Sequence, residues 1–210
     1  MTKKVFPKTF HFNELTIELH PEVYEPAEDS FLLIEALQIN PEDKLLELGT
    51  GCGLIALECA RRGANVICTD VNPNSIELAQ HNFERNLNLL KGTIEIRKGD
   101  LFSVIKDNEL FNVIVFNPPY LPTSNEERVG GWFDKSTDGG KDGIEVTKHF
   151  IKGVKKHLSK NGCAYFIFSS LSNRPKLGEY LIKKGFNYEI VASQKFDFES
   201  IDVYRITPTD

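Results

Sequence analysis

The tetrapeptide Asn117-Pro118-Pro119-Tyr120 carries groups that could hold a planar nitrogen for reaction. An amide or aromatic amine nitrogen is a weak nucleophile, because its lone pair is delocalised. The side-chain oxygen of Asn117 and the carbonyl oxygen of Pro118 can accept hydrogen bonds from such an NH2 group, and the prolines stiffen the turn. The ring of Tyr120 can stack on the planar group. Unless the tetrapeptide is merely a turn, Asn117, Pro118 and Tyr120 are candidate catalytic residues that orient a nitrogen for in-line attack on carbon.

A glycine-rich segment and two acids could hold a nucleoside that bears a positive charge. Gly49, Gly51 and Gly53 follow Glu47, and glycines let the backbone turn sharply and approach a ligand. Asp70 comes about 20 residues later, where a carboxylate can accept both hydroxyls of a ribose. The carboxylate of Glu47 would repel a pyrophosphate, but it suits the ammonium of a methionine moiety. This combination favours S-adenosylmethionine over a dinucleotide as the cofactor.

Asp100 and Leu101 extend this candidate cofactor site. The carboxylate can accept a hydrogen bond from the adenine amino group, and the leucine can pack on the ring. A plain glycine turn among surface acids is the alternative, but acids at successive strand ends disfavour it. A nicotinamide dehydrogenase is disfavoured by Glu47, and a non-catalytic cofactor-binding subunit would not require Asn117. The two groups of residues together predict methyl transfer from S-adenosylmethionine to nitrogen.

These residues need a scaffold that brings several strand ends together, and the apolar pattern predicts one. Helical and strand patterns alternate, which is typical of a parallel sheet, and the last two strands are close enough to pair as a hairpin. The prediction is an α/β fold with a doubly wound, mostly parallel seven-stranded sheet and an antiparallel C-terminal strand. The resemblance described below implies that this is the Rossmann-like arrangement of class I methyltransferases. The expected strands are 44–48, 65–69, 93–97, 112–116, 164–168, 188–193 and 201–206, and the expected helices run from Pro26 to before Pro41 and over 54–62, 73–87, 144–158 and 176–184.

Length and composition fit one domain. The chain has 210 residues, of which 40% are hydrophobic, and we divide it into a short N-terminal extension over 1–24 and a single methyltransferase domain over 25–210. The net charge of −5 argues against a broad nucleic-acid surface. No apolar run reaches the length of a membrane span or forms a signal peptide, so we expect a cytoplasmic protein. The cysteine spacing indicates reduced thiols and no metal site, at Cys52, Cys59, Cys68 and Cys163.

Several stretches make the chain similar to the HemK-type protein glutamine methyltransferases, a family within the class I methyltransferases. The similarity is greatest to the short eukaryotic and archaeal branch, because the chain is too short for the N-terminal helical domain of the bacterial branch. The segment 129–138 departs from the family pattern. The matching stretches are 23–33, 47–53, 69–73, 100–101, 115–120 and 139–143.

The resemblance implies a substrate, a partner and a set of binding residues. The substrate would be the glutamine of the Gly-Gly-Gln motif in class I peptide chain release factors, methylated on its side-chain nitrogen, although some members of the branch act on a histone lysine. The partner would be a small zinc-binding activator subunit. By position, the resemblance implies contact with the cofactor or substrate for Ser30, Glu47, Gly49, Asp70, Asp100, Leu101 and Asn117. The full set of residues that we expect to bind the cofactor is Tyr24, Pro26, Ser30, Glu47, Gly49, Gly51, Gly53, Asp70, Val71, Asp100, Leu101 and Asn117.

The loop over residues 121–142 is long for a compact domain, and such loops are usually functional or disordered. We expect it to embrace a basic protein segment beside the target side chain, with a solvated loop as the alternative. An exocyclic amine of adenine or guanine in DNA or RNA would suit the same tetrapeptide, but an acidic loop favours a protein over a polyanion. The acids of this loop are Glu126, Glu127, Asp134, Asp138 and Asp142.

Overall fold

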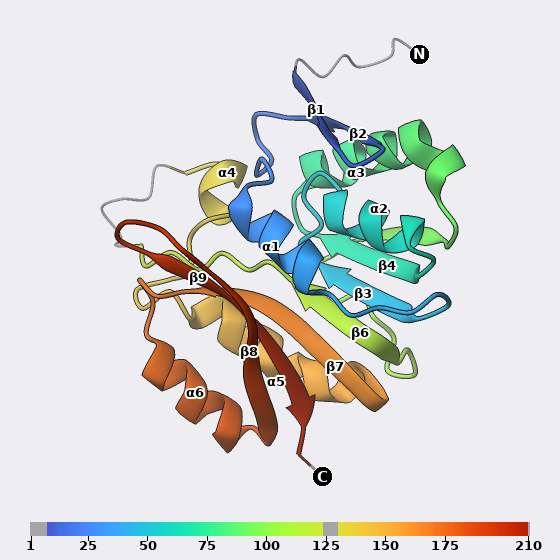
Figure 1. Cartoon of the computed structure of the whole chain (residues 1–210). Helices are drawn as coiled ribbons and strands as arrows, with labels where there is room; N and C mark the ends of the chain where they lie inside the picture. Colours follow the sequence, from blue (N-terminus) through green and yellow to red (C-terminus); the bar gives the residue numbers. More distant parts are fainter. Residues whose placement is uncertain (1–7, 124–129, 210) are drawn as a thin grey trace.

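A seven-stranded sheet forms the centre of the molecule in a computed structural model that describes residues 8–123 and 130–209 (Figure 1). The strand order is β5-β4-β3-β6-β7-β9-β8, and β9 runs antiparallel to both of its neighbours while the other pairs are parallel. This confirms the predicted fold class. The strands are β3 (Lys44–Leu48), β4 (Asn65–Asp70), β5 (Ile94–Lys98), β6 (Phe111–Phe116), β7 (Leu158–Ser169), β8 (Phe186–Lys195) and β9 (Ser200–Pro208).

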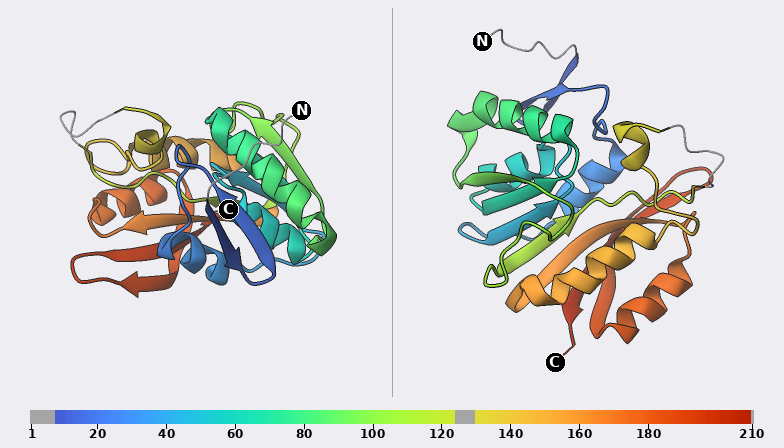
Figure 2. Two further views of the ribbon diagram at one scale, coloured as in Figure 1. Left: turned by 90° about the horizontal axis from the view of Figure 1, so that it is seen from above. Right: turned by 180° about the vertical axis from the view of Figure 1, so that it is seen from behind.

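Helices cover both faces of this sheet, as Figures 1 and 2 show from opposite sides. Successive residues of β6 alternate between two apolar clusters, with Val113 and Val115 in one and Ile114 and Phe116 in the other. The first cluster contains buried residues of α1 (Glu28–Ala36), α2 (Leu54–Arg61) and α3 (Pro73–Asn86), and the second those of α5 (Glu145–His157) and α6 (Arg174–Lys183). Burial on both faces explains why β6 is apolar without alternation.

An N-terminal hairpin of β1 (Lys8–Phe12) and β2 (Leu15–Leu19) packs on α3 (Figure 1). The apolar side chains of β2, which are Leu15, Ile17 and Leu19, belong to the same cluster as α1, α2 and α3. The division of the chain at residue 24 stays a prediction.

The structure differs from the predicted elements in a few places. Helix α1 begins at Glu28 after Ala27, so Pro26 precedes the helix instead of occupying its first position. Sequence patterns also missed β1, the short helix α4 (Trp132–Lys135) and the 3-10 turn η1 (Leu87–Leu89). All four cysteines are free and buried. None of the helices within the described ranges is long and apolar enough to cross a membrane.

Candidate active site

A cavity of about 310 Å³ lies where the carboxyl ends of β3, β4, β5 and β6 meet. The turns at these strand ends are where open α/β sheets bind ligands, and the cavity has the size of a small-molecule site. The candidate residues that line it are Tyr24, Pro26, Ser30, Glu47, Gly49, Gly51, Asp70, Val71, Asp100, Leu101, Asn117, Pro118 and Tyr120.

Gly53 is not among the residues that line the cavity, and its contact with the cofactor stays a prediction. It is the N-cap of α2, with a φ of 87° in the left-handed region that favours glycine. A Cβ atom at this position would lie 2.6 Å from Cε1 of Phe83 and 3.2 Å from Cβ of Ala79. Gly53 therefore serves the turn into α2 and the close approach of α3.

Glu47 is a buried carboxyl at the end of β3, with 1% of its surface exposed. Burial raises its pKa to about 8, although the hydroxyl of Thr50 donates a hydrogen bond of 2.6 Å to Oε2. The nearby charge of Asp70 raises the pKa of Glu47 further. A buried carboxylate is stabilised when a cation lies beside it, so this position suits a positively charged ligand.

Asp70 is the last residue of β4, and Leu101 lies three residues after the end of β5. The carboxylate of Asp70 accepts hydrogen bonds from the backbone N–H groups of Gly51 and Asn72, at 2.9 and 2.8 Å, and this fixes its orientation. Leu101 has a φ of 45°, a left-handed conformation that a leucine rarely adopts. Strained backbone of this kind clusters at ligand sites.

The amide of Asn117 is held by residues at the start of α1. Its Nδ2 donates to Oδ2 of Asp29 at 3.0 Å and to Oγ of Ser30 at 3.3 Å. The hydroxyls of Tyr24 and Tyr120 also donate to Oδ2 of Asp29, at 3.1 and 3.2 Å. A carboxylate beside the amide requires the NH2 group to face it. The amide oxygen of Asn117 must therefore point away from Asp29.

That oxygen is buried and accepts no hydrogen bond from any of the residues that the structure describes. Asn117 itself lies in the wall of the cavity, next to Pro118. Buried polar atoms almost always find a partner, so an orphan acceptor at a ligand cavity is suited to a donor from the ligand. The arrangement can hold an NH2 group by its hydrogens.

Sequence reasoning missed several residues of the cavity wall. Asp29 lies in a stretch that carries the family resemblance, but its contact with Asn117 depends on the folding of segments 88 residues apart. Trp132 and Lys135 belong to α4, and the ammonium of Lys135 lies 4.5 Å from the centre of the Trp132 ring. Figures 1 and 2 show α4 beside the segment that leads into α1, where the backbone N–H of Trp132 donates to the carboxylate of Glu22 at 3.3 Å. The clustering of Trp and Gly around residue 131 was the signal for these contacts.

Three acids of the 121–142 loop bond to the chain itself. Asp134 accepts from the backbone N–H of Gly130 at 2.7 Å, Asp138 accepts from that of Gly140 at 2.9 Å, and Asp142 pairs with Lys176. Glu126 and Glu127 lie outside the described residues. That this loop embraces a basic segment stays a prediction.

Comparison with known proteins agrees with this geometry. The family model described as the methyltransferase small domain matches residues 15–130. A putative protein N5-glutamine methyltransferase of Methanocaldococcus jannaschii is 40% identical over 190 residues, which cover 90% of this chain and 93% of that protein. Human methyltransferase HEMK2 is 29% identical over 195 residues, covering 89% of this chain and 90% of that protein.

A solved structure has the same fold. It is the Mtq2–Trm112 complex of E. cuniculi, described as responsible for methylation of the eRF1 translation termination factor, with a TM-score of 0.67 and 25% identity over 90% of this chain and 99% of that chain. The strand order and the cavity at the strand ends define a Rossmann-like methyltransferase. The chain belongs to the methyltransferase small domain family and, within it, to the protein N5-glutamine methyltransferases.

Proposed function

We propose that this enzyme transfers a methyl group from S-adenosylmethionine to the side-chain amide nitrogen of a glutamine, the one in the Gly-Gly-Gln motif of a class I release factor. The observation that carries the proposal is the amide oxygen of Asn117, which is buried and unpartnered within the described chain while the amide nitrogen is held by Asp29 and Ser30. The relatives support a protein substrate. A release factor glutamine methyltransferase of Clostridium acetobutylicum is 28% identical over 96% of this chain and 75% of that protein.

The charges around the cavity fit S-adenosylmethionine. Among the described residues of the wall, Lys135 is the one lysine or arginine, whereas four residues carry carboxyl groups, which are Asp29, Glu47, Asp70 and Asp100. Such a cavity attracts a sulfonium and an ammonium and repels a pyrophosphate. Glu47 would hold the ammonium, Asp70 the ribose hydroxyls, and Asp100 with Leu101 the adenine. When bound, the cofactor supplies an electrophilic methyl group.

The residues of the chain would act by orientation. The side-chain oxygen of Asn117 and the carbonyl of Pro118 would accept the two amide hydrogens, and the ring of Tyr120 would stack on the amide plane. As the N–C bond forms and the C–S bond breaks, positive charge grows on nitrogen, and both acceptors stabilise it. The nitrogen then loses one proton to water. A strong general base is unnecessary, because this proton becomes acidic as the bond forms.

The test is transfer of labelled methyl to a release-factor fragment that contains the Gly-Gly-Gln loop. A fragment with Gln→Ala is the matched substrate control, and a tRNA and a DNA duplex test the alternative acceptor, an exocyclic base amine. We expect Asn117→Ala to bind cofactor normally and to lose about 100-fold or more in kcat, as for removal of one oriented hydrogen-bonding group. Equal labelling of the two fragments, or preferred labelling of a nucleic acid, would contradict the proposed substrate.

We extend the proposal to a small zinc-binding activator subunit. It is supported by the solved complex, in which the similar Mtq2 is bound to Trm112. The same labelling assay with and without a subunit of that kind measures the dependence. Full activity of the chain alone would argue against an obligatory partner.

A further inference from the structure

Residues 99–110 connect β5 to β6, which lie two strands apart in the sheet, without a helix. We call this connection the β5–β6 loop. It crosses from one edge of the sheet, past β4 and β3, to β6. Parallel strands are usually joined through a helix that packs on the sheet, but no helix is present over these residues. The loop begins with Asp100 and Leu101 in the cavity wall. Backbone hydrogen bonds form turns within the loop, such as Ser103 N–H to the carbonyl of Asp100 at 2.9 Å, and side chains tie these turns to the neighbouring elements.

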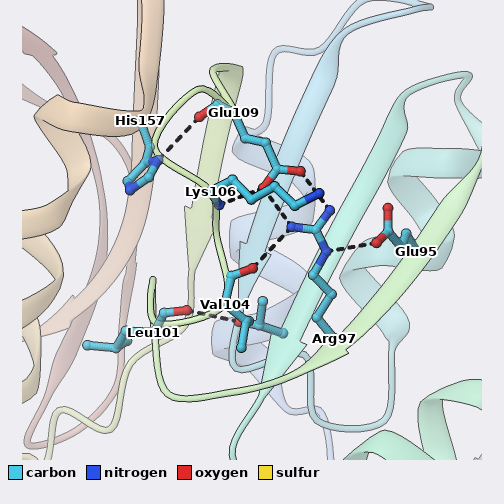
Figure 3. Close-up of polar contacts among 8 residues, drawn as sticks. Glu95, Arg97, Leu101, Val104, Lys106, Glu109 and His157 are labelled. Carbon is cyan, nitrogen blue, oxygen red and sulfur yellow. Dashed lines mark hydrogen bonds and ion pairs between the residues drawn. The ribbon is translucent and has the colours of Figure 1, made fainter.

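Arg97, near the end of β5, ties the two ends of this loop together (Figure 3). Its Nη1 and Nη2 donate to the two carboxylate oxygens of Glu109, each at 2.7 Å, and Nη1 also donates to the carbonyl of Val104 at 3.2 Å. Its Nε donates to Glu95 at 2.8 Å. A bidentate arginine–carboxylate pair fixes geometry in a way that a lysine cannot reproduce. The side chains of Arg97 and Glu109 are only 16% and 22% exposed, so water screens the pair weakly.

Glu109 also contacts another residue of the loop and a residue of α5. Its carboxylate accepts from the backbone N–H of Lys106 at 2.7 Å, and its carbonyl oxygen lies 3.2 Å from Nδ1 of His157 (Figure 3). The ring of Phe102, next to Leu101, stacks on His157 with centres 5.2 Å apart and planes 5° from parallel.

Gly153 of α5 makes room for that ring. A Cβ atom at Gly153 would lie 2.3 Å from Cδ2 of Phe102, closer than any real contact. Phe102 therefore rests in a notch of α5. The loop is anchored twice, by Arg97 at one end and by this notch just beyond Leu101.

We infer that Arg97 and Glu109 are positioning residues for cofactor selectivity. They hold the β5–β6 loop so that Asp100 receives the exocyclic amino group of adenine, and they oppose the strain of the left-handed Leu101. When the Arg97–Glu109 pair is weakened, the protein should lose affinity for a cofactor whose base carries an amino group. Its affinity for a cofactor whose base carries a carbonyl at the same position should change less. The inference rests on the proposed use of S-adenosylmethionine.

The test compares binding of two ligands by calorimetry, S-adenosylhomocysteine and its inosine counterpart, which replaces the amino group by a carbonyl. We expect Arg97→Lys to weaken S-adenosylhomocysteine about tenfold and the inosine ligand much less, because a lost orientation removes mainly the oriented hydrogen bond. KM for the cofactor should rise while kcat at saturation stays near the wild-type value. Arg205 forms a similar ion pair with Glu189 of β8, so Arg205→Lys is the matched control. It should change the binding affinity of neither ligand.

Gly153→Ala tests the second anchor without touching the ion pair. Displacement of Phe102 should reduce the same selectivity, whereas Gly178→Ala in α6, where a Cβ would meet the hydroxyl of Tyr188 at 2.7 Å, should not. Circular dichroism identifies any variant that fails to fold. If either Arg97→Lys or Gly153→Ala does not fold, the ligand selectivity of the remaining variant tests the inference. Equal weakening of both ligands in folded Arg97→Lys would overturn the inference. Failure of the wild-type chain to bind S-adenosylhomocysteine would instead overturn the proposed function.

Discussion

Asp29 is buried in the first turn of α1, where unsatisfied backbone N–H groups and the helix dipole favour a negative charge. Its Oδ1 accepts from the backbone N–H and hydroxyl of Ser30, and its Oδ2 accepts from Asn117, Tyr24 and Tyr120. Burial and the charge of Asp29 together raise the pKa of Tyr120 well above its usual value, so this phenol stays protonated and keeps donating. The carboxylate therefore sets the orientation of two candidate catalytic side chains at once.

Asp29→Asn keeps the shape of the side chain but offers an NH2 group to donors that need an acceptor. We expect kcat to fall at least about tenfold, because the amide of Asn117 loses its fixed orientation. Cofactor affinity should fall less, because Glu47, Asp70 and Asp100 remain in the cavity wall. Steady-state kinetics with separate cofactor and substrate titrations measures the split. Tyr24→Phe, which removes one donor and leaves the bond to Asn117, should have a smaller effect on kcat. A variant that changes only cofactor affinity would show that Asp29 does not orient Asn117.

Glu47 links ligand binding to protons. Its pKa in the folded chain, about 8, lies above the ordinary value of 4.5, so between these pH values the folded state holds more protons than the unfolded one. The stability of the ligand-free protein should therefore fall as pH rises through this range. A bound ammonium would favour the ionised carboxylate, so we expect S-adenosylhomocysteine to release protons on binding near pH 7.

Calorimetry in two buffers of different ionisation enthalpy measures this release. Glu47→Gln should abolish the buffer dependence and weaken binding, while Glu179→Gln, at an exposed position of α6, should leave both unchanged. A wild-type binding enthalpy that is the same in both buffers would contradict the linkage.

At the scale of elements, α3 holds the N-terminal hairpin through asparagine side chains, whose amide groups bond to the backbone of β2 as the peptide groups of a neighbouring strand would. Oδ1 and Nδ2 of Asn82 bond to the backbone N–H and carbonyl of Glu18, at 2.9 and 3.0 Å. Asn86, one turn later, makes the same pair of bonds to Thr16, each at 2.9 Å. Nδ2 of Asn82 also donates to the carbonyl of Cys52 at 2.8 Å, which connects the hairpin to the glycine-rich turn.

Asn82→Ala should destabilise the protein by about 2 kcal/mol or more, because it leaves buried backbone groups without partners. Urea unfolding measures the change in the free energy of unfolding. Gln80→Ala, which removes an exposed bond to Glu84 on the same helix, is the control and should cost about 0.5 kcal/mol or less. Comparable losses in the two variants would show that the hairpin contributes little.

The order of the central elements could be predicted from the sequence because each element carries its own signal. Asn72 followed by Pro73 predicts the start of α3, and the side chain of Asn72 does accept from the N–H of Asn74. In contrast, β1 has an exposed, weakly alternating pattern, and it exists because β2 provides a partner strand. The asparagines of α3 hold β2 in turn. Helix α4 is too short for a periodic pattern.

At the scale of the whole molecule, some contacts of the site could be predicted from the sequence and others could not. Residues at strand ends, such as Asp70 and Asn117, could be placed together because parallel strands bring their carboxyl ends to one edge. The contact of Asp29 with Asn117 could not, since it depends on how α1 packs across the end of β6. The packing of α3 against Gly53 could not be predicted either, because a glycine in a ligand turn and a glycine under a helix have the same spacing in sequence.

The burial of the four cysteines also determines how the molecule meets oxidants. Exclusion from water raises the pKa of the Cys52 thiol to about 12 and that of the other three above their usual range. Because the thiolate is the reactive species, the native protein keeps its sulfur in an inert form. Damage by peroxides or alkylating agents then follows the rate at which the interior opens, and at Cys52, in the cavity wall, an occupied site adds a second shield.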